Sequence, residues 1–227
     1  MFPRTDRRMK NILIIAGPSA VGKTTVAHRM LELDSRFEFV RSVTTRPCRA
    51  DQFDNEYIYI TTAEFQHLIE TAGVLEHTLY AGSYYGTPRS EIDRITSEGK
   101  IPLLILDING VESLCKNKGD ISPCGVYIYD DIDVMEERLY ERYKDDIENP
   151  ETQRRYNSRK NQNRLDYSEM PIHEPYFYSF IRNCSTVDCC AEKIGQIFAD
   201  FCNLVPKNEE NSKTISTELC ASVTVEK

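Results

Sequence analysis

The stretch IIAGPSAVGKTTV, residues 14–26, decides the fold. An apolar run ends at Ala16, glycines follow at positions 17 and 22, and Lys23 opens a helical pattern. Residues 17–24 match G-x-x-x-x-G-K-[ST], a loop in which glycines allow backbone N–H groups to point at phosphate oxygens. The strand before this loop and the helix after it are the context that the motif requires, and the positive end of the helix attracts phosphate. We therefore predict a nucleoside triphosphate site here and not a simple tight turn.

The motif also assigns roles to its side chains. Lys23 is expected to reach the β- and γ-phosphates, and the Thr24 hydroxyl to ligate Mg²⁺, the cofactor expected with ATP as co-substrate. The predicted ATP-binding residues of the loop are Gly17, Pro18, Ser19, Ala20, Val21, Gly22, Lys23, Thr24 and Thr25. The motif does not say which acceptor receives the phosphoryl group.

Strand-like and helix-like segments alternate along the chain. The predicted strands are residues 11–16, 37–40, 103–108, 125–129 and 177–181. The predicted helices are residues 23–33, 91–98, 110–118, 132–144 and 186–203. This alternation predicts an α/β fold with a parallel sheet covered by helices on both faces.

The segment between Arg46 and Pro88 differs from this pattern. It is rich in Tyr, Thr and Gly, and Thr61 with Glu64 forms a capping-box signature for one helix. We interpret it as a small mixed α+β insert. The predicted organisation is a flexible N-terminus (1–10), a domain (11–205) with core 11–45 and 89–205 and insert about 46–88, and a disordered tail (206–227).

Composition excludes some classes of function. The chain has 227 residues, 40% hydrophobic and 28% charged, with a formal net charge of −8. This acidic balance disfavours binding to nucleic acid or to an anionic membrane. No apolar run is long enough for a membrane span or a signal peptide, and the eight cysteines form no C-x-x-C pair. We therefore expect reduced thiols and a cytoplasmic protein.

A second group of residues suits a doubly charged anion. SVTTRPCRADQFDNEYIY, residues 42–59, contains Arg46, Arg49 and Tyr57, and GSYYGTPRS, residues 82–90, adds Tyr85. Two guanidinium groups with phenols make a good phosphate clamp, because the arginine fork matches phosphate geometry. The alternative is a solvated loop with surface arginines.

GPSAVGKTT, SVTTRP and YYGTPRS, in this order and spacing, resemble the guanylate kinases, and the resemblance extends from about Asn11 to Cys202. It implies a P-loop nucleotide-kinase core, a GMP-binding insert and a mobile helical lid. The implied reaction is MgATP plus GMP, with dGMP as a further acceptor, giving ADP and GDP.

The resemblance also assigns the acceptor site. It implies that Arg46, Arg49, Tyr57 and Tyr85 hold the GMP phosphate and that Ser42, Glu76, Thr87 and Asp107 contact guanine. Guanine offers N–H donors that suit carboxylates, whereas adenine would leave such buried carboxylates unpaired. Two simpler interpretations stay open. Asp107 could be a helix cap with no contact to guanine, and Tyr85 could be a core residue with no contact to the phosphate.

The predicted lid, about residues 138–160, is rich in arginine. Five arginines lie in residues 136–160, namely Arg138, Arg142, Arg154, Arg155 and Arg159. The resemblance brings Arg138, Arg142 and Arg155 onto the transferring phosphoryl group, where cations stabilise the spreading charge. We assign catalysis to Lys23, Arg46, Arg138 and Arg155, and further ATP contacts to Arg142 and Asn183. A salt-bridged solvated helix face is the alternative for the lid, and an ordinary loop residue for Asn183.

Two departures from the family pattern stand out. Ile105 occupies a position where the family often has an acid, and Asp51-Gln52 replaces a Gly-Glu pair. Three hypotheses remain: a GMP kinase, a P-loop kinase for another acceptor such as a ribose phosphate, and a non-catalytic guanylate-kinase-like module. Glu76 with Asp107 argues against the second, and Lys23 with the lid arginines against the third. The expected partners are GMP and ATP, and the expected state is a monomer or a weak homodimer.

Overall fold

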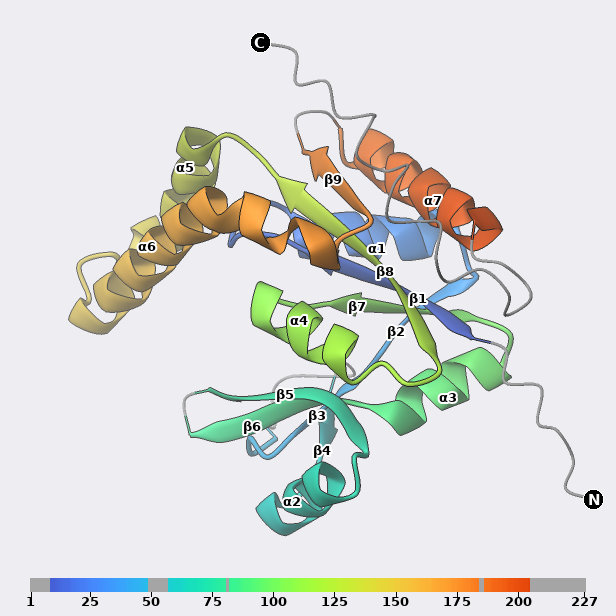
Figure 1. Cartoon of the computed structure of the whole chain (residues 1–227). Coiled ribbons are helices and arrows are strands. Elements are labelled where there is room, and N and C mark those ends of the chain that lie inside the picture. Colours follow the sequence, from blue (N-terminus) through green and yellow to red (C-terminus); the bar gives the residue numbers. More distant parts are fainter. Residues whose placement is uncertain (1–8, 49–56, 81, 184–185, 205–227) are drawn as a thin grey trace, which may run out of the picture.

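A parallel sheet forms the centre of the molecule (Figure 1). The structure is a computed structural model that describes residues 9–48, 57–80, 82–183 and 186–204. Within these residues five strands run in the order β2-β7-β1-β8-β9, and every neighbouring pair is parallel. The strands are β1 (Lys10–Ala16), β2 (Phe37–Phe39), β7 (Ile101–Ile105), β8 (Ile121–Tyr129) and β9 (Ser179–Arg182). The predicted α/β fold with a parallel sheet is confirmed.

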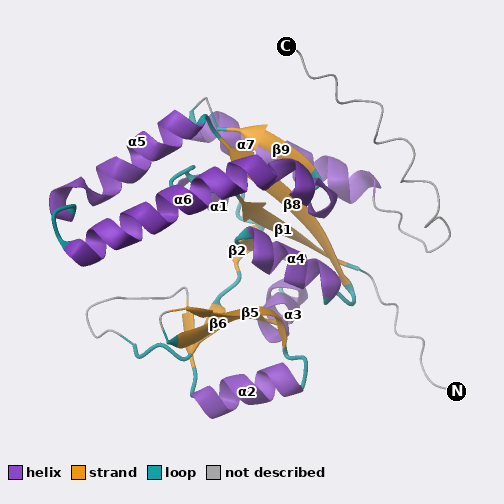
Figure 2. Cartoon of the chain, turned by 60° about the vertical axis from the view of Figure 1, so that its left-hand side comes forward, coloured by secondary structure: helices purple, strands orange, loops and turns teal. Residues whose placement is uncertain are grey.

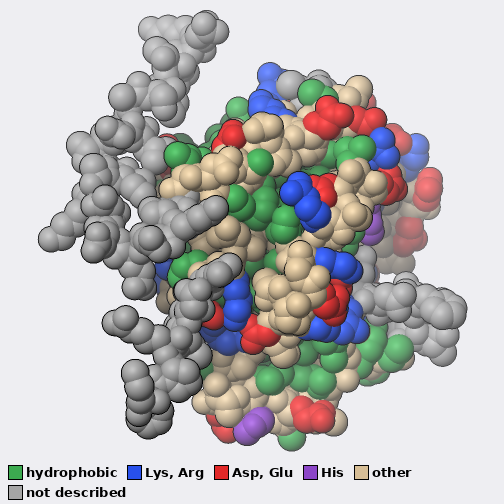
Figure 3. Space-filling view, turned by 90° about the vertical axis from the view of Figure 1, so that its right-hand side faces the viewer, with side chains coloured by type: hydrophobic (Ala, Val, Ile, Leu, Met, Phe, Trp, Pro, Cys, Tyr) green, Lys and Arg blue, Asp and Glu red, His purple; other side chains and the backbone are tan. Residues whose placement is uncertain are grey.

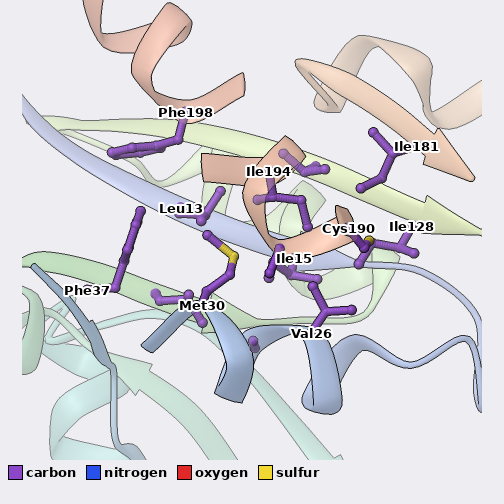
Figure 4. Close-up of a cluster of buried hydrophobic side chains, with 14 of the residues drawn as sticks. Leu13, Ile15, Val26, Met30, Phe37, Ile128, Ile181, Cys190, Ile194 and Phe198 are labelled. Carbon is purple, nitrogen blue, oxygen red and sulfur yellow. The ribbon is translucent and has the colours of Figure 1, made fainter. Parts of the chain in front are cut away.

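The central strand β1 is buried on both faces, because helices cover the sheet on either side. Ile12 and Ile14 pack toward one pair of helices, and Leu13 and Ile15 toward the other, all with 0% exposure. Figure 4 shows Leu13 and Ile15 among side chains of the helices on the second face. The helices are α3 (Arg89–Ser97) and α4 (Ile108–Lys116) on the first face, and α1 (Lys23–Leu33) and α7 (Val187–Leu204) on the second.

The start of β1 lies earlier than the sequence suggested. Lys10, which we placed in the flexible N-terminus, is the first residue of the strand, and its Nζ donates to Asp93 at 2.6 Å and to Asp120 at 2.8 Å.

Basic and acidic side chains are interspersed on the face shown in Figure 3. The predictions for residues 1–8 and for the tail 206–227 lie outside the described residues.

The insert is a second, smaller sheet with one helix. Its strand order is β4-β3-β6-β5, with β3 parallel to β4 and antiparallel to β6. The Thr61–Glu64 capping box is present at its helix, and Phe65 of that helix stacks on Tyr84. The insert begins before the predicted residue 46, because β3 belongs to its sheet. Its elements are β3 (Ser42–Thr44), β4 (Tyr57–Tyr59), α2 (Thr62–Glu70), β5 (Val74–Tyr80) and β6 (Ser83–Pro88).

The predicted lid is a helical hairpin. Its helices are α5 (Ile132–Tyr143), a 3-10 turn η1 (Lys144–Asp146) and the long α6 (Pro150–His173). Asn149 caps α6 by accepting from the Glu151 N–H, and Pro150 occupies the first helical position. Glu136 of α5 pairs with Lys160 and Arg164 of α6, which ties the two helices together. Figure 2 shows the hairpin extending from the core, with the insert below it.

The aromatic segment before the last strand is half-buried and packs against the core. After α6 the chain makes a 3-10 turn, η2 (Glu174–Tyr176), and enters β9. Phe177 and Phe180 lie 5.2 and 5.3 Å from the ring of buried Tyr127. This packing explains why aromatic residues are dense in this part of the chain.

Candidate active site

The loop between β1 and α1 needs both of its glycines. Gly17 has φ of 145°, and a Cβ there would lie 2.1 Å from the Ile128 carbonyl oxygen. Gly22 has φ of 102° and is the N-cap of α1, which begins at Lys23 as predicted. Both positions are in the left-handed region that favours glycine, and position 17 has no room for any side chain. The strand, the loop and the helix start therefore form the context that the motif requires.

Lys23 folds back over this loop. Its Nζ donates to the carbonyl oxygens of Gly17 at 2.7 Å and Pro18 at 2.8 Å. Burial is the main reason that its pKa falls from 10.5 to about 8; nearby Arg142 and Arg159 lower it further, while Asp166 and Asp107 oppose the change. A half-buried ammonium group that donates to carbonyl oxygens, with two arginine charges nearby, is well placed to attract a polyanion.

Three polar side chains meet where the insert packs on the core. Glu76 of β5 is 8% exposed and accepts a 2.6 Å hydrogen bond from the Thr87 hydroxyl of β6. Asp107 lies on the core side, and a Cβ on Gly110 would be 3.3 Å from Asp107 Oδ1 and 3.6 Å from Glu76 Oε2. The two carboxylates therefore flank the same glycine.

Burial raises the pKa of Glu76, the Thr87 hydroxyl opposes this, and the charge of Asp107 raises the pKa further. Such a carboxylate gains stability when a ligand donates hydrogen bonds to it. Asp107 also caps α4, because its Oδ1 accepts from the Gly110 N–H at 2.7 Å. The capping interpretation of Asp107 is therefore confirmed, and it leaves a second carboxylate oxygen for a ligand.

Arg46 and three tyrosine side chains lie close together on the insert. The Arg46 Nη2 donates to the Tyr59 hydroxyl at 3.1 Å, and the Arg46 Cζ is 5.2 Å from the Tyr57 ring centroid. Tyr85 meets Tyr57 edge to face at 5.9 Å, and it is half-buried rather than a core residue. Ser42 pairs with Tyr57 in the register of β3 and β4. Arg49, the other predicted clamp arginine, lies outside the described residues.

The lid arginines divide into two groups. Arg138 Nη1 lies 3.0 Å from Asp130 Oδ2, and Arg155 pairs with Glu151 on its own helix. Arg142 and Arg159, by contrast, act on the pKa of Lys23, and the Arg159 Nη1 donates to the Ser19 hydroxyl at 3.0 Å. The structure thus brings Arg142 and Arg159 to the loop and holds Arg138 and Arg155 in ion pairs.

Asn183 supports the loop from the far side. Its Nδ2 donates to the Val21 carbonyl oxygen at 2.7 Å, and its backbone N–H donates to Tyr129. The side chain is 8% exposed. This bond fixes the turn before Gly22, and a contact between Asn183 and a nucleotide base stays a prediction.

A family model described as guanylate kinase matches residues 9–193 of the chain. The chain belongs to the guanylate kinase family. Guanylate kinases of Streptococcus pyogenes serotypes M3 and M18 are each 35% identical to it over 142 residues. Each match covers 60% of this chain but 65% of the relative, less than two thirds of its length. A solved guanylate kinase from Anaplasma phagocytophilum has the same fold, with a TM-score of 0.58 at 20% identity, covering 86% of this chain and 87% of that one.

Three residues of this candidate site were not assigned from the sequence. Tyr59 bonds Arg46, Arg159 reaches Ser19, and Asp166 acts on Lys23. Arg159 is four residues after the assigned Arg155, so the two share a face of α6. That spacing was visible in the sequence, but the extent of α6 was not.

The side chains around Lys23 suit a hard cation. Thr24 is exposed in the first turn of α1, and the charges of Asp107 and Asp166 reach the same lysine. Hydroxyl and carboxylate oxygens are ligands that Mg²⁺ prefers, and Mg²⁺ usually keeps several waters and binds through substrate phosphates. The described residues contain no group of three or more His, Cys, Asp and Glu side chains placed to hold a metal by themselves.

In the same part of the chain, no helix has the length and apolar character needed to cross a membrane.

Proposed function

We propose that the protein is a guanylate kinase that transfers the γ-phosphoryl group of MgATP to GMP and produces ADP and GDP. The observation that carries this proposal is the buried Glu76, which accepts a hydrogen bond from Thr87 and lies beside Asp107. Guanine N1–H and its exocyclic amine are the donors that two such carboxylates accept. We extend the proposal to dGMP because we have assigned no residue a contact with the ribose of the acceptor.

The P-loop would hold the donor nucleotide. Backbone N–H groups of the loop and the start of α1 face phosphate oxygens, and Lys23 exchanges its carbonyl partners for the β- and γ-phosphates. Mg²⁺, bound through the Thr24 hydroxyl, would neutralise charge on those phosphates. Phosphate binding would raise the pKa of Lys23 again and keep it charged over a wider pH range, because a nearby anion favours the protonated form.

The insert would hold the acceptor. Arg46, with Tyr57 and Tyr85 beside it, would bind the GMP phosphate, and Ser42 would complete the guanine contacts with Thr87. Arg49 has the same proposed role as Arg46. Holding both substrates in place removes the entropic cost of bringing two reactants together. Such positioning, together with electrostatic stabilisation, is how a kinase accelerates phosphoryl transfer.

The lid would supply the remaining cations. Arg159 contacts Ser19 of the loop and the charge of Arg142 acts on Lys23, so both are candidates to meet the transferring phosphoryl group. Arg138 and Arg155 stay candidates, and each must first leave its carboxylate partner, Asp130 or Glu151. Cations placed where charge develops lower the barrier without further reorganisation.

The two other hypotheses are less well supported. A ribose phosphate acceptor gives no reason for a buried Glu76 beside Asp107 on the acceptor side, and a non-catalytic module gives no reason for Lys23 to fold over the loop. A cytoplasmic location and a monomeric or weakly dimeric state stay predictions from composition.

A coupled assay of ADP release tests the proposal. GMP should be phosphorylated far faster than AMP, UMP or ribose phosphates, and dGMP should also react. A Glu76→Gln variant should lose this preference, and Glu64→Gln is a control on the same insert because Glu64 only caps α2. Equal rates with GMP and AMP in the wild type would reject the proposal.

A further inference from the structure

Helix α6 has one buried residue, and it is polar. Asn163 is 1% exposed, and no other residue of this helix is buried. A buried amide costs free energy unless it is hydrogen-bonded, so the hydrogen bonds of the Asn163 side chain must matter; near the end of α6 the half-buried Met170 also packs against the core.

Asn163 uses both ends of its amide on one residue of the P-loop. Its Oδ1 accepts from the Ser19 N–H at 2.8 Å, and its Nδ2 donates to the Ser19 carbonyl oxygen at 3.0 Å. One turn earlier on the same face, Arg159 donates to the Ser19 hydroxyl. Backbone and side chain of Ser19 are therefore all held from α6.

The next residue of the loop is conformationally costly. Ala20 has φ of 65°, in the left-handed region that non-glycine residues rarely adopt. Such a backbone persists only where its surroundings enforce it. The paired hydrogen bonds of Asn163 on Ser19 are the contacts that hold the residue before it.

We propose that Asn163 is a positioning residue: its amide fork on Ser19 keeps the Ser19–Ala20 turn in the shape that binds the ATP phosphates. This inference rests on the proposed nucleotide site, and it assigns Ser19 a role different from the one its motif position implied. Its N–H serves the fork rather than a phosphate. Ordering of α6 and competence of the P-loop are then coupled, because the same two hydrogen bonds serve both.

The fork also places a limit on lid movement. Asn163 lies just beyond the predicted lid end at residue 160, whereas Arg155 lies two turns further out on the same face. Any lid opening that preserves nucleotide binding must therefore bend α6 between Arg155 and Asn163, or leave α6 in place.

Binding of a non-hydrolysable ATP analogue, measured by calorimetry, tests the fork. Asn163→Ala should weaken the analogue by about tenfold or more, since two hydrogen bonds are lost, and should leave GMP affinity unchanged. Asn163→Asp has nearly the same shape but sets an oxygen against the Ser19 carbonyl, so it should weaken the analogue at least as much. Asn161→Ala and Asn161→Asp, at an exposed position of the same helix, are the matched controls and should bind like the wild type.

Amide hydrogen exchange at Ser19 gives a second readout. It reports the hydrogen bond of the Ser19 N–H itself and not only a change in the shape of the side chain at position 163. The Ser19 N–H should be protected in the wild type and in both Asn161 variants, and exposed in Asn163→Ala, which removes its acceptor; Asn163→Asp keeps that acceptor and loses the donor to the Ser19 carbonyl. Wild-type analogue affinity in a folded Asn163→Ala protein with an unprotected Ser19 amide, or in a folded Asn163→Asp protein, would overturn the proposal. If Asn163→Ala does not fold, the Asn163→Asp variant decides. Because the analogue binds without GMP, failure of GMP phosphorylation would reject the proposed function and leave this test intact.

Discussion

Glu76 and Glu91 are both buried, and their surroundings move their pKa values in opposite directions. Glu91 is 4% exposed and receives two hydrogen bonds from Arg41, at 2.8 and 2.9 Å, and two from Arg94, at 3.0 and 3.3 Å. The Arg41 hydrogen bonds are the main cause that lowers its pKa to about 2. Glu76 is 8% exposed, bonds the neutral Thr87 hydroxyl, and has a raised pKa because of burial.

The difference separates scaffold from site. A buried carboxylate with arginine partners is complete, and it joins α3 to the chain before β3. In the described part of the chain no arginine or lysine ion pair reaches Glu76, so its charge lacks compensation until donors arrive. A buried ionisable group in this condition marks a ligand site more often than a structural one.

The largest expected effect is at Lys23, a half-buried charge that has no carboxylate in hydrogen-bond contact among the described residues. Lys23→Ala should lower kcat by roughly a hundredfold to a thousandfold or more, the loss typical of one preorganised charge-stabilising donor. The fold and the affinity for GMP should be kept. The measurement is ADP release together with circular dichroism and GMP titration, and near-normal ADP release by the folded variant would contradict the assignment.

Glu76→Gln should weaken GMP by roughly ten- to a hundredfold, which corresponds to about 1.5–3 kcal/mol for one charge-assisted hydrogen bond. Affinity for the ATP analogue should stay unchanged, since only the acceptor meets this side chain. Calorimetric titration of each nucleotide separates the two effects. Parallel losses for both nucleotides would mean that the substitution disturbs the fold and not the guanine contact.

Glu91→Gln should affect the stability of the fold and not the affinity for GMP. It should lower the free energy of unfolding in urea by about 1–3 kcal/mol, because it removes charge-assisted bonds from Arg41 and Arg94. The lowered pKa of Glu91 stabilises the fold above the ordinary carboxyl pKa, and this contribution is lost as the pH falls toward about 2. The variant should therefore lose less stability than the wild type over that range, with its GMP affinity unchanged. Weaker GMP binding by a folded variant would break the contrast between the two glutamates.

The smallest effects are in the pH profile. The free enzyme should lose kcat/KM for ATP as the pH rises through about 8, because Lys23 then loses its charge. Affinity for GMP should decline on the acid side, and begin to do so above the ordinary glutamate range, because the pKa of Glu76 is raised and only the ionised form accepts both donors. Steady-state kinetics from pH 5 to 9 would measure both limbs. An acid limb that persists unchanged in Glu76→Gln would assign it to another group.

The sequence predicted what depends on local pattern. The P-loop, the start of α1 at Lys23 and the Thr61–Glu64 box follow from residue types at fixed spacing, and all are present. The meeting of Glu76 with Asp107 followed from family resemblance alone, because residues of β5 and α4 come together only through the tertiary fold.

What the sequence did not yield has physical reasons. Helix α6 has no apolar stripe, so its course past residue 160 was not visible, and Asn163 and Asp166 were missed. The choice among lid arginines depends on partners such as Asp130 for Arg138, and distant partners leave no trace in spacing.

The most direct test of the contrast is carbon-13 NMR of the glutamate carboxyl groups, titrated with pH in the absence and presence of saturating GMP. Signals are assigned with Glu76→Gln and Glu91→Gln. The free protein should give Glu76 a pKa above 4.5 and Glu91 a pKa well below it. Bound GMP should lower the pKa of Glu76, because donors to a carboxylate favour its ionised form, and should leave that of Glu91 unmoved. A Glu76 pKa that is the same with and without GMP would contradict the account.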